Sequence, residues 1–328
     1  MKQVNLYFPI ILLIASLVTI SCTSSKTDSN QQEVGSNRRD TQDNQTDDKV
    51  FKLPEIPEEI TNSELRAQYL VEHYWDNFNF SNRDLINLPE VTEQAFVDYI
   101  NILYHVPKDK ADKSLIEVVK RTEVDTLMHI HFNSLFEKYF YDPNSPFRNE
   151  EFYIPVLNQI LRSSLLTDTE KSLYEFQLDM VMENRVGEKG NNFKYTLASG
   201  ETDSFYNIQS EYTLLMFSNP GCSTCETVTR QLVASESIKN ALALNTPART
   251  MLTILTLYPD EDLDEWLDHL PNMPKNWVHG YDSDMEITHK RLYDIKAIPT
   301  LYLFDSEKKV ILKDTSIEAV ENYFSTPR

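Results

Sequence analysis

The sequence predicts an all-α helical domain over residues 51–190, followed by a mixed α/β sheet with flanking helices over residues 191–328. Before residue 190, apolar side chains recur three or four positions apart, which is the spacing of amphipathic helices. After it, short apolar runs alternate with helical segments, the pattern of a mixed α/β sheet. Gly187 and Gly190 bracket a polar patch where we place the boundary. A chain of 328 residues is long enough for two such domains.

Residues 1–22 have the features of a secretory signal. Lys2 gives a short positive start, and residues 6–20 form an apolar run that is too short for a typical membrane span. The small residues before Cys22 resemble a bacterial lipobox, although Thr19 stands where such sites usually have leucine. That resemblance implies cleavage before Cys22 and acylation of its thiol and amine. The alternative is an ordinary signal peptide that contains a cysteine.

Residues 23–50 are predicted to be a disordered tether. They are rich in Ser, Thr, Asn, Gln and Asp and contain few apolar residues, so they cannot bury a core. A lipid anchor at Cys22 predicts a membrane-attached protein of the cell envelope, on the periplasmic face. Thr23 is not the aspartate that favours retention in the inner membrane of related systems, so the outer membrane is favoured, with surface exposure left open.

Composition excludes several classes of function. The formal net charge is -20, which argues against a nucleic-acid partner and against electrostatic docking on anionic lipids. The chain has only 6 glycines and lacks both the dinucleotide-binding and the Walker glycine patterns, so no cofactor is predicted. Its 3 cysteines are too few for a disulfide-stapled domain.

Five helices are expected in residues 51–190. Possible capping boxes at residues 61–64 and 167–170 begin the first and the last of them, and a fourth helix is expected near Pro155. The apolar stripes are Leu65, Tyr69, Leu70, Tyr74 and Phe78; Phe96, Tyr99, Ile100, Leu103 and Tyr104; Met128, Phe132, Leu135, Phe136 and Tyr139; and Leu173, Phe176 and Met180. Aromatic residues at this spacing indicate a core rather than a ligand site.

Neither a metal site nor a catalytic constellation is predicted in this helical part. His129 and His131 are two positions apart and therefore do not share a helix face. Residues 65–80, which include AQYLVEHYWDNFNF, resemble a domain of unknown function that precedes thioredoxin-like modules in bacterial lipoproteins. The resemblance implies an architecture but no activity.

The second part is expected to hold strands at residues 193–197, 212–218, 251–257, 277–281, 300–304 and 310–313. Helices are expected from residue 222 to 233 and over residues 262–270, 284–293 and 317–324. The run 212–218 is almost wholly apolar, as in a central strand buried on both faces. Asn219, Pro220 and Gly221 then break it.

Cys222 and Cys225 carry the predicted chemistry. Cys222 should lie at a helix N-terminus, where unpaired N–H groups and the helix dipole favour the nucleophilic thiolate. Cys225 lies one turn further and can attack a mixed disulfide formed on Cys222. A zinc site needs further ligands, but there is no second cysteine pair, and His269, His279 and His289 are scattered.

Ile298, Pro299 and Thr300 enter a predicted strand, and with the cysteine pair they resemble the thioredoxin superfamily, especially its TlpA/ResA-like envelope branch. The resemblance covers residues 191–328. It implies a thioredoxin-like fold and a cis Ile298–Pro299 bond against the cysteines. It also implies substrate binding at these three residues and exchange with protein thiols or disulfides, with an unidentified redox partner.

Departures from that family leave alternatives open. Met216 replaces the buried acid that helps to deprotonate the resolving thiol, and the aromatic residue usual before the first cysteine is absent. Glu226 is interpreted as a solvated helix acid. The main hypothesis is an envelope thiol–disulfide oxidoreductase. One alternative is a non-catalytic, partner-binding lipoprotein with a structural disulfide. A third, peroxide reduction, expects threonine where Asn219 stands.

Overall fold

The computed structural model describes residues 50–326. The predicted signal, the lipidation site Cys22 and the tether before residue 50 lie outside the described residues. Within them, no helix combines the length and the apolar character that a membrane span requires.

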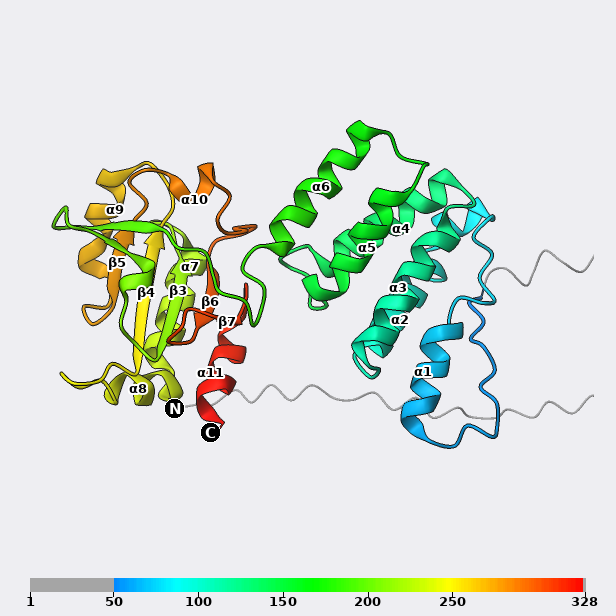
Figure 1. The fold of residues 1–328 in the computed structure, drawn as a ribbon, viewed down its shortest axis with the longest axis horizontal. Coiled ribbons are helices and arrows are strands. Elements are labelled where there is room, and N and C mark those ends of the chain that lie inside the picture. The colour runs from blue at the N-terminus through cyan, green and yellow to red at the C-terminus, as the bar shows by residue number, and fades with distance from the viewer. Residues whose placement is uncertain (1–49, 327–328) are drawn as a thin grey trace, which may run out of the picture. The chain divides into compact units, whose positions relative to one another are not determined.

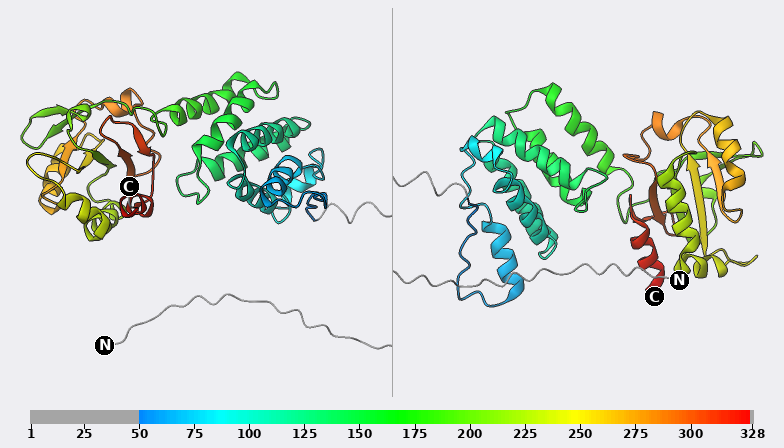
Figure 2. Two further views of the ribbon diagram at one scale, coloured as in Figure 1. Left: turned by 60° about the horizontal axis from the view of Figure 1, so that its bottom comes forward. Right: turned by 180° about the vertical axis from the view of Figure 1, so that it is seen from behind.

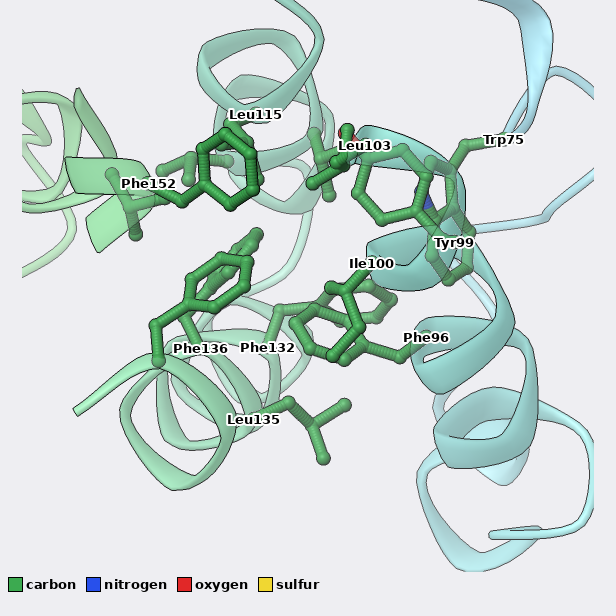
Figure 3. Packing of buried hydrophobic residues seen from close by; sticks show 14 of the residues in the cluster. Trp75, Phe96, Tyr99, Ile100, Leu103, Leu115, Phe132, Leu135, Phe136 and Phe152 are labelled. Carbon is green, nitrogen blue, oxygen red and sulfur yellow. The ribbon is translucent and has the colours of Figure 1, made fainter. Parts of the chain in front are cut away.

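The first half is helical, as predicted (Figure 1). Its elements are α1 (Ser63–His73), η1 (Arg83–Asn87), α2 (Thr92–Leu103), α3 (Lys108–Thr122), α4 (Thr126–Phe140), α5 (Glu150–Arg162) and α6 (Asp168–Met182). The predicted stripes on α2 and α4 meet in one aromatic core, where Phe96, Phe132 and Phe136 are fully buried (Figure 3). Tyr104 was expected in this core but is exposed, because α2 ends one residue before it.

Several helix starts differ from the expectation. Asn62, not Thr61, caps α1, since its side-chain oxygen accepts a backbone N–H of the first turn. The chain leaves the helix after His73, so Tyr74 and Phe78 reach the core from beyond its end.

Asn149 caps α5, which therefore begins five residues before Pro155. The capping box from Thr167 to Glu170 is confirmed at the start of α6. Leu173 and Phe176 of that helix are exposed, however, and only the more distal end of the predicted stripe is buried.

The second half is a mixed sheet in the order β2-β1-β5-β4-β3-β6-β7. Its elements are β1 (Lys194–Leu197), β2 (Thr202–Ser204), η2 (Phe205–Asn207), β3 (Tyr212–Phe217), α7 (Ser223–Ala234), α8 (Glu236–Ala243), β4 (Leu252–Tyr258), α9 (Leu263–His269), η3 (Leu270–Asn272), β5 (Val278–Tyr281), α10 (Glu286–His289), β6 (Thr300–Phe304), β7 (Val310–Leu312) and α11 (Ile317–Ser325). Strands β3, β4 and β5 are parallel, whereas β6 runs antiparallel to β3. The predicted helix over 284–293 is reduced to the single turn of α10.

Both faces of β3 are buried, as its apolar run predicts. Leu214 and Met216 pack in one cluster with residues of α7, α8 and α11, which lie on the same side of the sheet (Figures 1 and 2). Leu215 and Phe217 pack on the opposite face, against Phe205 and other aromatic residues. The sheet therefore holds the end of β3 rigidly in the core.

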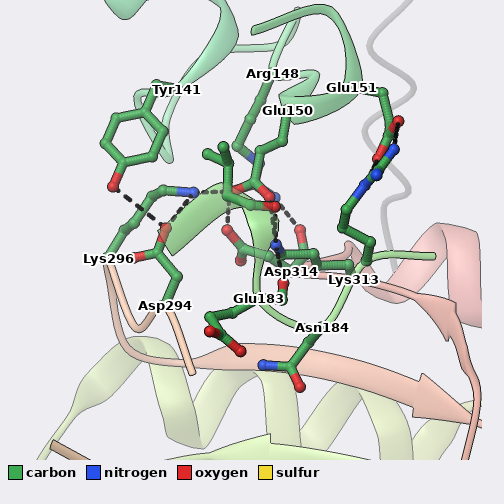
Figure 4. A network of polar contacts seen from close by, with 12 residues as sticks. Tyr141, Arg148, Glu150, Glu151, Glu183, Asn184, Asp294, Lys296, Lys313 and Asp314 are labelled. Carbon is green, nitrogen blue, oxygen red and sulfur yellow. Dashed lines mark hydrogen bonds and ion pairs between the residues drawn. The ribbon is translucent and has the colours of Figure 1, made fainter. Parts of the chain in front are cut away.

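A buried charged network joins α5 to the loops around β6 and β7 (Figure 4). Glu150 of α5 pairs with Lys296 and, at 2.7 Å, with Lys313. Lys296 also lies 3.0 Å from Asp294, and Arg148 lies 3.0 Å from Asp314. Because Lys296 precedes Pro299 by three residues, the network fixes the loop that enters β6.

Candidate active site

A sharp break after β3 places Cys222 at the start of α7. The strand ends at Phe217, and Gly221 has φ +68°, a left-handed conformation that glycine adopts without steric cost. The next residue, Cys222, is extended and is the N-cap of α7. This cysteine therefore lies at a helix N-terminus, as predicted.

The Cys222 sulfur lies at the N-terminus of α7, beside a backbone N–H donor. Its Sγ atom accepts the backbone N–H of Cys225 at 3.2 Å, in the manner of an N-cap side chain. The positive end of the α7 dipole adds to this interaction. The side chain is only partly buried. Cys222 thus combines access with donors that suit a nucleophilic thiolate.

Cys225 has the opposite environment. It is only 3% exposed and packs against the core face of β3. Burial is the main cause that raises the pKa of the Cys225 thiol to about 11, and its contact with Cys222 acts in the same direction. A hydrogen bond from the Asn219 backbone and one from the Ser218 side chain partly oppose this rise. At neutral pH Cys225 is therefore a protonated thiol beside a more accessible partner.

The loop before β6 brings the predicted substrate-binding residues to the same place. The Ile298–Pro299 peptide bond is cis, and the Ile298 carbonyl oxygen lies 3.8 Å from the Cys222 sulfur. Thr300 begins β6 opposite Phe217 and is buried, with its hydroxyl donating to the Ala297 carbonyl. Its side chain is thus turned into the loop, whereas the Ile298 carbonyl faces the cysteine.

Two of the departures noted in the sequence have clear positions. Met216 is fully buried in the apolar cluster beneath α7, so no carboxyl group replaces the missing acid there. Glu226 is exposed and lies 3.7 Å from Arg230 on the next turn of α7. This position agrees with its interpretation as a solvated helix acid.

Sequence reasoning missed the polar groups behind Cys225. Ser218 was taken as the last residue of a strand, and His269 as one of several scattered histidines, yet both line the same hollow beside the Cys225 side chain. The position of Ser218, directly after a buried strand and four residues before Cys222, is a signal that could have identified it. His269 could not be found in this way, because only the packing of α9 brings it close.

The structure offers no clustered metal ligands among residues 50–326. His129 is buried in α4, and its Nδ1 atom lies 2.8 Å from the Thr122 hydroxyl. Burial lowers the pKa of His129 and of His131. His129 is thus part of the packed helical core.

Comparisons with known proteins cover both halves of the chain. Residues 21–184 match the model of a domain of unknown function, DUF5106, and residues 210–310 match a thioredoxin-like model. None of the curated proteins compared with the chain matches it.

The chain is also similar to solved structures. A thioredoxin-like protein from Bacteroides caccae is 45% identical, with 84% of this chain and 98% of that chain covered and a TM-score of 0.80. The C-terminal domain of an uncharacterized Bacteroides fragilis protein is 45% identical over 44% of this chain and 99% of its own, with a TM-score of 0.41. A domain of a possible thiol-disulfide isomerase from Cytophaga hutchinsonii is 24% identical over 44% and 93%, with a TM-score of 0.37. The chain belongs to the family of thioredoxin-like proteins in which a DUF5106 region precedes the thioredoxin-like domain.

Proposed function

We propose that this protein is an envelope thiol–disulfide oxidoreductase that exchanges disulfides with client proteins. The observation that carries the proposal is the position of Cys222, which begins α7 and lies 3.8 Å from the Ile298 carbonyl, with Cys225 one turn behind. A thioredoxin-like domain supports a general redox role.

The two sulfurs would act in order. The Cys222 thiolate attacks a client disulfide, forms a mixed disulfide and releases one client thiolate. Cys225 then loses its proton and attacks the Cys222 sulfur, which releases the second client thiolate and leaves a Cys222–Cys225 disulfide. The client is reduced and the pair is oxidised. A separate redox partner must reduce the pair again, and the reverse sequence oxidises clients.

Replacing Cys225 by serine is expected to trap client proteins on Cys222. The variant retains the attacking sulfur but lacks the group that resolves the mixed disulfide. We expect high-mass adducts on non-reducing gels that disappear when a thiol reductant is added. Mass spectrometry of the purified adducts would identify the clients and the cysteines joined.

The matched control is Cys222→Ser, in which Cys225, buried and protonated, is the remaining thiol of the pair, and it should form no adducts. An absence of adducts in Cys225→Ser would contradict the proposal. If the wild-type pair also had a reduction potential below about -300 mV, the disulfide would be structural. That result would favour the partner-binding alternative.

We also propose that Cys22 anchors the mature chain to the membrane. Acylation of both its thiol and its amine would provide more than one chain, and stable membrane attachment requires at least two such signals. Cys22→Ser is expected to abolish incorporation of an alkyne-tagged fatty acid in cells and to release the protein from the membrane fraction.

Cys222→Ser serves here as the control, because it removes another cysteine and should leave the fatty-acid label unchanged. Labelling of Cys22→Ser at the wild-type level would disprove the anchor.

A further inference from the structure

A hollow of about 330 Å³ lies behind the resolving cysteine. Its walls include Ser218, Cys225, Glu226, Arg230 and His269. Neither Cys222 nor Ile298 lines it, although both lie at the site where a client disulfide would be attacked. Cys225 therefore faces two environments: the Cys222 sulfur on one side and this hollow on the other.

The resolving thiol needs a proton acceptor that the apolar core does not supply. Cys225 is nearly sealed, its pKa is raised to about 11 by burial, and Met216 occupies the position of the family's acid. A thiol with such a pKa is almost wholly protonated at neutral pH, and only the thiolate attacks a disulfide. Fast resolution therefore requires a local route for the proton.

The hollow provides donors and acceptors for such a route. The Ser218 hydroxyl and the Asn219 N–H donate to the Cys225 sulfur, which stabilises the thiolate after proton loss. The hollow is large enough for several water molecules. Within residues 50–326, the half-buried His269 ring has no hydrogen-bond partner in the protein, so its acceptor nitrogen is free to accept a hydrogen bond from water in the hollow.

The other charged and titratable groups around the hollow are already engaged. Glu226 and Arg230 of α7 form an exposed ion pair at 3.7 Å. His279 of β5 lines an adjoining hollow together with Ser218 and His269. Its Nδ1 lies 2.6 Å from the Thr256 hydroxyl, and its Nε2 lies 2.9 Å from the Pro274 carbonyl. His269 of α9 is therefore the group best placed to take the proton.

We infer that Cys225 releases its proton into this hollow, past the Ser218 hydroxyl and through water to His269. This inference rests on the proposed function. The Cys225 S–H bond breaks, its proton moves to the imidazole and its electron pair stays on sulfur. The thiolate then attacks Cys222 Sγ, the disulfide between Cys222 and the client breaks, and the client leaves as a thiolate. The proton exit is thereby separate from the client side.

The test is a two-phase stopped-flow reaction of the reduced full chain with 5,5′-dithiobis(2-nitrobenzoic acid), with Cys22 replaced by serine in every protein compared so that only Cys222 and Cys225 can react. The first phase forms a mixed disulfide on Cys222 and releases one coloured thiolate. The second phase is the attack by Cys225, which releases another. At pH 7 we expect His269→Gln and Ser218→Ala to slow the second phase at least about tenfold and to leave the first unchanged. Added imidazole should restore the second phase in His269→Gln.

The matched control is His289→Gln, which removes an exposed histidine at the end of α10 and should leave both phases and their pH dependence unchanged. Equal second-phase rates in wild type and both variants would overturn the inference, as would an equal slowing of both phases, which indicates a structural effect. If the wild-type chain released only one equivalent, the proposed function itself would fail.

Discussion

Replacing Glu150 by alanine is expected to lower the free energy of unfolding by about 3–5 kcal/mol, the usual cost of removing one partner from a buried ionic cluster. The Glu150 side chain is 11% exposed and touches two lysines, Lys296 and Lys313, which are 6% and 8% exposed. Loss of the carboxylate leaves two buried ammonium groups with less negative charge to balance them. Chemical denaturation of the full chain, followed by far-UV circular dichroism, measures the effect.

Glu151 is a well-matched control for this substitution. It is the next residue in the first turn of α5, so it shares the helix dipole, but its partner Arg185 is 33% exposed and the carboxylate itself 36%. This half-buried pair keeps access to water, and fully exposed pairs contribute about 0–1 kcal/mol. Glu151→Ala should therefore lower the free energy of unfolding only slightly. Equal losses of unfolding free energy in the two variants would show that burial of the network does not determine its contribution.

The effect of Glu150 should also depend on pH. Burial raises the pKa of its carboxyl group, but Lys313 and Lys296 outweigh burial and hold the pKa below the usual 4.5. Because the folded-state pKa is lower than the unfolded one, the stabilisation is complete above about pH 4.5 and is lost as the pH falls through the folded-state value. The stability difference between wild type and Glu150→Gln should therefore shrink on acidification below pH 4.5.

The network also shows what the sequence could not reveal. Glu150 and Lys296 are 146 positions apart, and each reads as a solvated charge when it is considered alone. Helix α3 was missed for a related reason. Its buried face consists of Ala111, Leu115, Val118, Val119 and Thr122, and charged residues dominate its other positions. Local patterns predict well only where apolar residues dominate.

The cysteine site was predictable because its determinants are close in sequence. An apolar strand, a Pro-Gly break and a cysteine at a helix start all lie between Tyr212 and Cys225. The approach of Ile298 followed only from the family resemblance. The hollow behind Cys225 is lined by residues of α7 and by His269 of α9, and no local pattern specifies that they come together. The reactive cysteines were thus easier to predict than the residues that surround them.

Gly190 gives the second large stability prediction, and it marks a place where the sequence was interpreted too simply. Gly187 and Gly190 were taken together as signs of a domain boundary, but they serve different purposes. A Cβ atom on Gly190 would lie 2.4 Å from Cε1 of Phe304, a fully buried ring. Gly187 has open space around it, and glycine is favoured there instead because its φ is +87°.

Gly190→Ala is expected to cost about 1–3 kcal/mol through overpacking, since the Phe304 ring cannot move without displacing its aromatic neighbours. Gly187→Ala should cost about 1–2 kcal/mol through backbone strain alone. The two causes can be separated by replacing Phe304 with leucine, which has a smaller side chain. Phe304→Leu should recover part of the loss in Gly190→Ala and none in Gly187→Ala, as measured in double-mutant cycles of unfolding free energy. Additive effects in the Gly190 cycle would mean that the Phe304 ring is not the reason why residue 190 must be glycine. The backbone hydrogen bond from Gly190 to Lys308 would then be the next feature to test.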